Sequence, residues 1–411
     1  MPTGWHLVYF FVTSVPECSC VSNGCGLCRF EIYLVEREHE EIGRKMTDLE
    51  RDIQGADNES TELMRGKVSI PVIVLNWNGV YDTIECVDAL LASDGVDFRV
   101  VLVDNDSSAD DFEHLRARYE SHEKIELRRN AQNLGFARGV NAVLQEVLAC
   151  PRNRPEFVSL LNNDAVPEPG WLAALVTKAE SSGAGAVASK MIRHDNRDRL
   201  DNAGHVFLNT GEILPRGAGQ SPDDYIKPAS VAGVCGGACL LRSSMLDDIG
   251  MFDEFFSTGY EDAELGLRAL LAGYEQIFAP KAVVRHRIGA SIDKIRDLSY
   301  AVQLQVNINY TYVKLVPWPV AVWNLPWILL KTVALLILPL LMGRWRLLKV
   351  QWRAFGRTMR FLPTMFRARR RFKKRRVSSS VVIGRQKFFA RLYAGYFRRF
   401  VIGGKPTIFE R

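Results

Sequence analysis

The sequence predicts an α/β fold in which a doubly wound, mostly parallel sheet carries helices on both faces. Short apolar runs rich in branched side chains alternate with segments of helical spacing, which is typical of such sheets. Three of the runs end abruptly in polar clusters. Hydrophobic residues make up 47% of the 411 residues and charged residues 24%, which is ordinary globular usage and excludes a fibre or a disordered chain.

The first predicted strand covers residues 68–75, because a continuous branched apolar run is typical of a strand buried on both faces. The sequence NWNG (76–79) ends this run, and residues 80–92 then show helical spacing. A second buried strand is predicted at 99–103, and it ends in the cluster DNDSS (104–108). This strand–helix–strand order favours parallel pairing.

The alternation continues toward the centre of the chain. A short third strand is predicted at 125–127, a helix at 134–149 and a fourth strand at 157–161. The fourth strand ends in the cluster NND (162–164). After Pro280 the pattern degrades, and residues 296–315 have helical spacing.

The predicted domain organisation has four segments. They are an N-terminal extension of unknown role (1–66), the α/β domain (67–292), a helical region (293–376) and a basic aromatic tail (377–411). The extension carries cysteines spaced C-x-C-x4-C-x2-C at Cys18, Cys20, Cys25 and Cys28. A zinc knot and a dispensable extension are the two interpretations, and the lack of finger-like framing favours the second.

The helical region combines an apolar segment (320–342) with a basic segment (343–376). The apolar segment has 23 residues and one charge, Lys331, so it is long enough to cross a bilayer. The basic segment has 14 Lys and Arg residues and no Asp or Glu, although the whole chain has a net charge of only +6. Such a concentration of cations predicts a polyanionic partner, either membrane lipid or nucleic acid.

A membrane-surface arrangement is the preferred interpretation of this region. By the positive-inside rule, the cations that follow the apolar segment stay on the cytoplasmic side of the membrane. The preceding domain is also expected there, and a single crossing would place the two on opposite sides. Pro326 and Pro339 are predicted to break the apolar segment. We therefore expect an interfacial or re-entrant segment gripped by anionic lipid, and the alternative is a buried helix of a soluble domain.

Ligands of open α/β sheets bind beyond the carboxyl ends of the strands, where the three polar clusters lie. The sequence NWNG is neither the G-x-G-x-x-G of a dinucleotide site nor a P-loop. Because no glycine cradle for phosphate is present, the simplest remaining device is a divalent cation between a carboxylate and a diphosphate.

Six motifs together carry a resemblance to a known family. In order along the chain they are VIVLNWNG, VLVDNDSS, NLGFARGVN, LLNNDAVPEPGWL, GGACLL and FFSTGYEDAELGLRALLAGY. Their order and spacing resemble those of inverting family-2 glycosyltransferases of GT-A fold. The most similar subgroup is bacterial and adds rhamnose or furanose sugars to lipid-linked glycans. The resemblance covers residues 67–292 and implies a GT-A sheet there.

The resemblance implies a set of nucleotide-binding residues. Asp104 would accept a hydrogen bond from the imide nitrogen of uracil or thymine. The other implied positions are Asn76, Asn133, Gly135, Arg138 and Asn163, the last of them on the ribose. The structural alternatives are a turn at Asp104 and helix capping by Asn133 with a surface arginine.

The resemblance also implies a metal and a catalytic base. NND occupies the place of the D-x-D metal motif but begins with Asn162, so Asp164 is the remaining carboxylate for Mg²⁺ or Mn²⁺. His286 would be a second ligand. Asp262 would be the general base, with Glu261 in support. The alternative for both carboxylates is stabilisation of a helix dipole.

Two glycines and a missing motif complete the expectations. Gly236 and Gly237 either allow the backbone to approach the donor or acceptor closely or form a bulge in a strand. Processive synthases of the family carry Q-x-x-R-W, and this chain lacks it, so we expect addition of a single sugar.

The expected partners are a nucleotide-sugar donor, a glycan or polyprenyl-linked acceptor and anionic membrane lipid, without nucleic acid. The expected location is the cytoplasmic face of the bacterial inner membrane. Two other classes of function compete with the glycosyltransferase: a non-catalytic membrane-bound scaffold, and a protein that binds nucleic acid through its basic tail.

Overall fold

The computed structural model describes most of the chain after the N-terminal extension. The described ranges are 68–149, 153–257, 259–287, 298–341 and 343–389. The chain divides into two compact units, Met1–Gly66 and Lys67–Arg411, and only the second contains described residues. The four-cysteine cluster of the extension and residues 390–411 of the basic aromatic tail lie outside the described residues.

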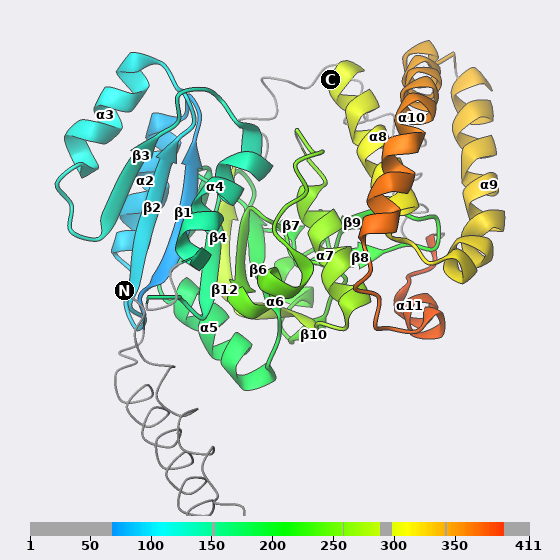
Figure 1. Ribbon diagram of the computed structural model, residues 1–411. Helices are drawn as coiled ribbons and strands as arrows, with labels where there is room; N and C mark the ends of the chain where they lie inside the picture. The colour runs from blue at the N-terminus through cyan, green and yellow to red at the C-terminus, as the bar shows by residue number, and fades with distance from the viewer. Residues whose placement is uncertain (1–67, 150–152, 258, 288–297, 342, 390–411) are drawn as a thin grey trace, which may run out of the picture. The chain divides into compact units, whose positions relative to one another are not determined.

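A single sheet of ten strands forms the centre of the described unit (Figure 1). The order along it is β10 (Ala229–Ser230), β12 (Gln276–His286), β6 (Ala186–Arg193), β11 (Ala238–Arg242), β4 (Phe157–Leu161), β1 (Ile70–Asn76), β2 (Phe98–Asp104) and β3 (Ile125–Arg129). The short strands β5 (Ala165–Pro167) and β7 (Leu200–Asn202) pair with β12 and β6. Among the eight strands in this order, only β10 and β11 run against the others, so the predicted mostly parallel sheet is confirmed.

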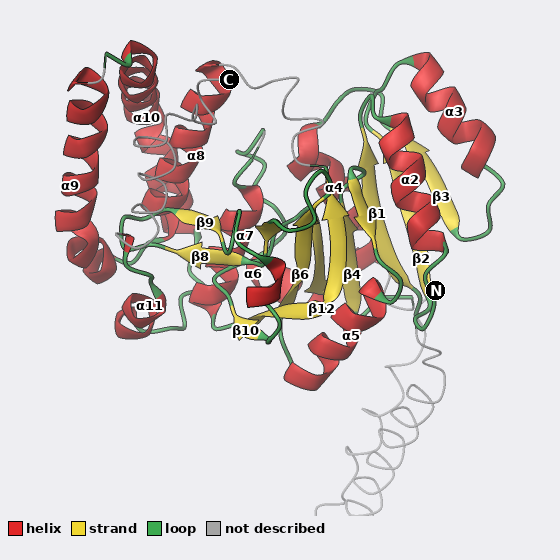
Figure 2. Cartoon of the chain, turned by 180° about the vertical axis from the view of Figure 1, so that it is seen from behind, coloured by secondary structure: helices red, strands yellow, loops and turns green. Residues whose placement is uncertain are grey.

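Helices cover both faces of the sheet, as predicted (Figures 1 and 2). One face carries α2 (Val80–Leu91), α3 (Ala109–Tyr119) and α5 (Trp171–Ser182). The other carries α4 (Gly135–Ala149), α6 (Ser243–Ile249) and α7 (Glu261–Ala272). Strand β1 explains this layering, because Val72 and Val74 point into one core and Ile73 into the other.

The predicted elements differ from the observed ones mainly at their ends. The first strand begins two residues later than predicted, at Ile70, while the fourth strand has the predicted bounds. The direction of β11 was not predictable from composition. A strand buried on both faces reads as the same apolar run whether its neighbours run parallel or antiparallel to it.

Four helices extend the structure beyond the end of the sheet. They are α8 (Leu298–Leu315), α9 (Trp318–Leu341), α10 (Trp345–Arg371) and α11 (Ser379–Arg385). Figures 1 and 2 show α10 between α8 and α9, with α8 next to α7. Leu315, Val316 and Val320 pack against Leu267 and Leu271 of α7, so the C-terminal helices share a core with the sheet domain.

A buried ion cluster joins α8 to the sheet domain. Lys314 Nζ lies 2.6 Å from Glu264 Oε1 and 2.6 Å from Asp253 Oδ2. Arg268 Nε donates to Glu264 Oε2 at 2.8 Å. Glu264 has no exposed surface, and removing one partner of a buried ion pair typically costs about 3–5 kcal/mol. Lys314 is therefore part of the folded core that the sheet domain and α8 share.

The prediction that prolines break the apolar segment is wrong. Helix α9 is continuous from Trp318 to Leu341 and contains both Pro326 and Pro339. Each proline removes one backbone donor, whereas the leucine-rich turns around it keep their own hydrogen bonds and favour the helix. By length and composition α9 is able to cross a membrane, and 11% of its most apolar stretch is buried within the protein.

Candidate active site

The three polar clusters meet at one edge of the sheet because β4, β1 and β2 are neighbours. Asn163 donates through Nδ2 to Thr83 Oγ1 at 3.0 Å, and Thr83 donates to Asn76 Oδ1 at 2.9 Å. Asn76 in turn donates through Nδ2 to Asp104 Oδ1 at 2.9 Å. Three segments far apart in the sequence are thus joined by one chain of hydrogen bonds, with Thr83 as a link that the sequence analysis missed.

Asp104 lies at the end of this chain of hydrogen bonds and has no exposed surface. Its Oδ2 accepts the Ser107 backbone N–H at 3.2 Å, and Arg129 Nε lies 3.5 Å away. These contacts hold the loop after β2. They agree with the structural alternative for Asp104, a role in the turn. The expected contact between Asp104 and a nucleotide base stays a prediction.

Asn133 lies in the loop before α4, and Gly135 and Arg138 lie in the first turn of that helix. Asn133 Oδ1 accepts the Gly135 N–H at 2.8 Å and the Asn105 side chain at 2.9 Å, so it caps the helix. Gly135 has a φ of +71°, and a Cβ there would lie 3.0 Å from the Ser257 carbonyl oxygen. Arg138 is exposed and lies 3.4 Å from Glu254. Nucleotide binding by these three residues stays a prediction.

Asp164 and His286 come together at the ends of β4 and β12. His286 Nε2 lies 3.2 Å from Asp164 Oδ1, and among the described residues this buried oxygen accepts no hydrogen bond. The Arg287 N–H donates to the Asp164 carbonyl at 2.9 Å and fixes the two segments to each other. A buried carboxylate oxygen without a hydrogen bond, next to an imidazole nitrogen, fits a divalent cation.

The second ring nitrogen of His286 is held by a residue that the sequence analysis missed. Asp201 Oδ2 lies 2.8 Å from His286 Nδ1. A carboxylate in this position orients a ligating imidazole and fixes its tautomer. Burial opposes the charged imidazolium, but the Asp164 and Asp201 carboxylates outweigh burial and raise the pKa of His286 to about 10. Without a cation, the imidazolium lies between the two carboxylates and is hydrogen-bonded to Asp201.

Asp262 lies at the N-terminus of α7 on the other side of the Gly236–Gly237 turn. Its Oδ2 accepts the Gly236 N–H at 3.0 Å, and its side chain is 20% exposed. Its Oδ1 lies 2.7 Å from the Ala263 nitrogen. The carboxylate is thus fixed in orientation yet open to solvent on one side, as a general base requires.

Glu261 is in a different environment from Asp262. Its Oε2 is buried without a hydrogen-bond partner among the described residues. Burial, followed by the charge of Asp262, raises the pKa of Glu261 to about 8. At neutral pH Glu261 is therefore mostly protonated and is not suited to accept a proton.

The raised pKa of Glu261 implies that the stability of the folded chain depends on pH. In the unfolded chain this glutamate ionises near pH 4.5, whereas in the folded chain it stays protonated up to about pH 8. The free energy of unfolding therefore decreases as the pH rises through this range. We expect Glu261→Gln to increase the free energy of unfolding by about 2 kcal/mol more near pH 9 than near pH 5. The measurement is denaturant unfolding at both pH values. Glu120→Gln, at an exposed glutamate, is the control, and an equal effect of Glu261→Gln at both values contradicts the assignment.

Two further residues around Asp262 gave no signal in the sequence. Tyr260 precedes the carboxyl pair with a φ of +79°, a strained conformation for a tyrosine that is typical of functional sites. His205 Nε2, in the hairpin of β8 (His205–Phe207) and β9 (Ile213–Pro215), lies 3.8 Å from Asp262 Oδ2. Burial lowers the pKa of His205, which leaves the ring neutral beside the base.

The Gly236–Gly237 turn connects the two halves of the site. A Cβ on Gly237 would lie 3.1 Å from the Asn162 side chain, and one on Gly236 would lie 3.5 Å from the Asp262 Cβ. The Asn162 N–H also donates to the Gly237 carbonyl at 2.8 Å. Both glycines lie in a turn before β11, so the strand-bulge interpretation is wrong, and close backbone approach to the donor or acceptor stays a prediction.

Comparison with known proteins finds similarity to glycosyltransferases. Residues 72–250 match the family described as Glycosyl transferase family 2. A pre-mycofactocin glycosyltransferase of Mycobacterium tuberculosis is 30% identical over 199 residues, which cover 46% of this chain and 37% of that protein. An N-acetylglucosaminyl-diphospho-decaprenol L-rhamnosyltransferase of the same species is 26% identical over 204 residues, which cover 46% and 66%. The chain thus spans less than two thirds of either relative.

Solved structures of glycosyltransferases also align with the chain, and one of them serves as an example. It is a mannosyltransferase from Pyrobaculum calidifontis in complex with GDP-Man and Mn²⁺, with a TM-score of 0.45 and 18% identity over 74% of this chain and 87% of that one. The family match covers five of the six motifs completely, and the sixth, FFSTGYEDAELGLRALLAGY, follows it in the sequence. Residues 72–250 thus form a domain that is similar to glycosyl transferase family 2.

Proposed function

We propose that the protein is a metal-dependent, inverting glycosyltransferase that adds one sugar to a lipid-linked or cell-surface glycan. One observation carries the proposal: the Asp164–His286 pair and the solvent-open Asp262 lie on opposite sides of the Gly236–Gly237 turn. Similarity to a protein named as a rhamnosyltransferase of a decaprenol-linked acceptor supports a rhamnose-like or furanose donor.

The proposed reaction is a single displacement. Asp262 takes the proton of the acceptor hydroxyl, and the hydroxyl oxygen attacks the anomeric carbon of the donor. The bond between that carbon and the diphosphate oxygen breaks, so the configuration inverts and the nucleoside diphosphate leaves. A Mg²⁺ or Mn²⁺ held by Asp164 and His286 supplies charge neutralisation for this leaving group.

The test of the proposed function is a screen of nucleotide sugars with the purified full-length chain. We expect slow release of nucleoside diphosphate from one donor class, with Mn²⁺ or Mg²⁺ present and not in excess chelator. Transfer to a polyprenyl-diphosphate acceptor should then follow with inversion at the anomeric carbon, which proton NMR of the product detects. Release from no donor in the presence of either cation overturns the proposal.

We further propose that α9 lies in the membrane interface on the cytoplasmic side and does not cross the bilayer. Its single cation, Lys331, turns toward the sheet domain and lies 2.7 Å from Glu212 Oε1, in the loop between β8 and β9. A crossing helix would carry that loop into the hydrocarbon core, where a polar backbone is not tolerated. Exposed apolar side chains cover the rest of the helix: Trp318, Val322, Trp323, Leu325, Leu329, Leu330, Val333, Leu336, Ile337, Leu340 and Leu341.

A pair of point substitutions tests the interfacial placement. Leu329 and Leu336 are 56% and 46% exposed, so Leu329→Glu combined with Leu336→Glu should leave the fold intact. We expect this variant to move from the membrane fraction to the soluble fraction, with an unchanged melting temperature. The control is Ile226→Glu, at a residue 66% exposed outside the C-terminal helices, which should stay membrane-bound. Retention of the double variant on membranes contradicts the placement.

Truncation after Ile292 is unsuitable for this test because it would remove Lys314 from the buried Glu264. Protease treatment of sealed inverted vesicles addresses the topology instead. The exposed Arg357 and Arg360 of α10 should be cut from outside these vesicles. Protection of this helix would identify a true span.

A further inference from the structure

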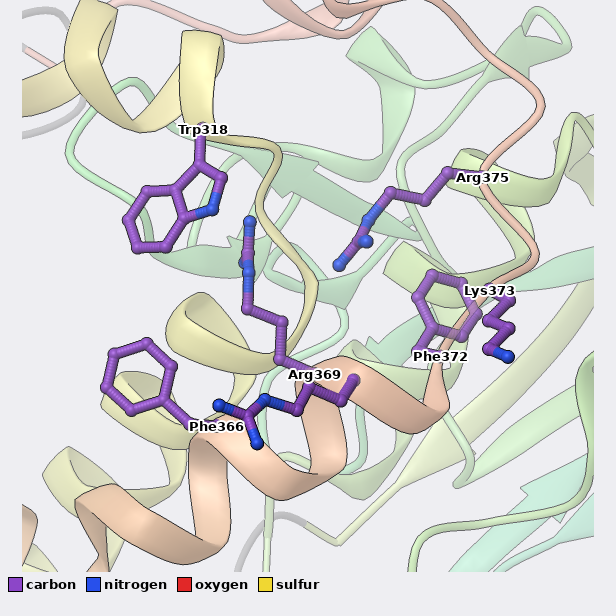
Figure 3. Close-up of a pocket in the computed structure, with 7 residues that line it drawn as sticks. Trp318, Phe366, Arg369, Phe372, Lys373 and Arg375 are labelled. Carbon is purple, nitrogen blue, oxygen red and sulfur yellow. The ribbon is translucent and has the colours of Figure 1, made fainter.

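A hollow of about 560 Å³ lies where the start of α9 meets the end of α10. Its lining consists of four cations and three aromatic rings: Arg369, Arg370, Lys373, Arg375, Trp318, Phe366 and Phe372. Figure 3 shows Arg369 beside the Trp318 ring, with Arg375 reaching toward the same space from the opposite side. None of the lining residues is acidic, so the hollow concentrates positive charge without compensation.

Two of the four cations are fixed in place by the end of α8. Arg369 donates to the carbonyls of Val313 and Val316 at 2.8 and 2.7 Å. Arg375 donates to the carbonyls of Leu315 and Lys314 at 3.2 and 3.1 Å. These neutral carbonyls position the guanidinium groups without cancelling their charge. Burial lowers the pKa of both arginines, and Arg375 adds to this effect at Arg369.

The other two cations, Arg370 and Lys373, are exposed and form no ion pair with any residue in the described part of the chain. Two fixed guanidinium groups and two free cations around one space suit a group that carries more than one negative charge. Phosphate meets this requirement, because arginine forks bind its oxygens in pairs and the charge-assisted bonds are strong.

The aromatic side of the hollow indicates what carries the phosphate. Arg369 lies 4.4 Å from the centre of the Trp318 ring, and Trp318 is 61% exposed. Trp318 is also the first residue of α9, so the exposed apolar face of that helix begins at the rim of the hollow. A ligand with a phosphate and a long apolar chain matches both parts, whereas a soluble phosphate leaves the apolar face uncovered.

We propose that this hollow binds the phosphate group of a membrane lipid, with the lipid chain lying along the exposed face of α9. The inference rests on the proposed interfacial placement of α9 and adds a specific headgroup site to it. Arg370 and Lys373 close on the phosphate oxygens, while Arg369 and Arg375 hold it from below. The site distinguishes a phosphate monoester from a diester, because the monoester carries more charge and an additional free oxygen.

The test compares two vesicle compositions at matched surface charge, one with phosphatidic acid and one with phosphatidylglycerol, both in phosphatidylcholine. We expect the full-length chain to bind the phosphatidic acid vesicles about tenfold more tightly, the equivalent of one additional charge-assisted bond. In the double variant Arg370→Gln with Lys373→Gln, called the hollow variant below, the ratio of the two binding affinities should fall to about one. Arg370→Lys with Lys373→Arg should retain it.

The matched control removes two cations from α10 outside the hollow. Arg357→Gln with Arg360→Gln changes the net charge equally, so it should weaken binding to both vesicles alike and keep the ratio. A ratio that survives in the hollow variant, or that disappears equally in the control, means that the helix is a nonspecific cationic surface and overturns the site.

Free inorganic pyrophosphate distinguishes a lipid from a soluble ligand. We expect soluble pyrophosphate to compete only weakly with phosphatidic acid vesicles, since it lacks the apolar chain. Tight binding of pyrophosphate that the vesicles do not displace overturns the lipid assignment. The hollow variant should release nucleoside diphosphate in detergent as fast as the unmodified chain. If no donor is turned over at all, the vesicle ratio still decides the lipid site, so the two proposals fail separately.

Discussion

Replacing Asp262 by Asn is expected to lower kcat by about 10²–10⁴-fold, the range typical of general base catalysis. The asparagine keeps the shape of the side chain, and its carbonyl oxygen is still able to accept the Gly236 N–H. It cannot accept a proton from the acceptor hydroxyl. Donor affinity should therefore stay close to that of the unmodified chain, which titration calorimetry with the donor in the presence of Mn²⁺ measures.

The competing interpretation of Asp262 is purely structural, and it predicts a different outcome. A carboxylate in the first turn of a helix stabilises its dipole by about 0.3–1 kcal/mol. On that interpretation, Asp262→Asn lowers the melting temperature slightly and leaves turnover unaffected. The control is Asp223→Asn, at an exposed carboxylate in the first turn of the short helix Pro222–Asp224. A loss of turnover smaller than about threefold would remove Asp262 from the base role.

Replacing Asp164 by Ala is expected to lower turnover by about 10²–10³-fold, because the leaving diphosphate loses its charge neutralisation. In the unmodified chain, chelation should abolish transfer, and Mg²⁺ or Mn²⁺ should restore it. The variant should not recover at the same cation concentration. Thermal unfolding gives an independent measurement: Mn²⁺ with nucleoside diphosphate should stabilise the unmodified chain and not Asp164→Ala.

The removal of Asp164 also frees His286 from one of its two carboxylates. In the cation-free variant Asp201 still holds the imidazole, so the fold around β12 should persist. Circular dichroism and the melting temperature without cation check this point. Full activity of Asp164→Ala in excess chelator would falsify a metal-dependent mechanism at this site.

The central strands were predictable because β1, β2 and β4 are buried on both faces and read as uninterrupted branched runs. The order of strands in the sheet was not. Strand β11 lies between β4 and β6 and runs against both, yet its burial makes its composition indistinguishable from that of its neighbours. The continuous helix through Pro326 was also missed, because one proline removes only one backbone donor, while the leucine-rich turns around it and the packing on α10 keep the helix intact.

In the site, the sequence indicated the side chains that follow strands or begin helices, such as Asp164 and Asp262. It did not indicate the residues that hold them. Asp201 lies 85 positions from His286 and His205 lies 57 positions from Asp262, and neither belongs to a motif. The strained φ of Tyr260 likewise depends on the tertiary structure, since its hydroxyl accepts the Ile213 N–H at 2.6 Å.

The ion cluster of Lys314, Glu264 and Asp253 limits how this protein can be recombined with its relatives. A chimera that takes the sheet domain from one parent and the C-terminal helices from another joins two halves of one charge network. If the donor helix lacks the lysine, the buried Glu264 loses one of its two cationic partners, on the same helix that carries the proposed catalytic base in its first turn. Helices α7 and α8 therefore form an indivisible block, and viable crossover points for grafting a new membrane-binding region lie after Lys314 in the sequence.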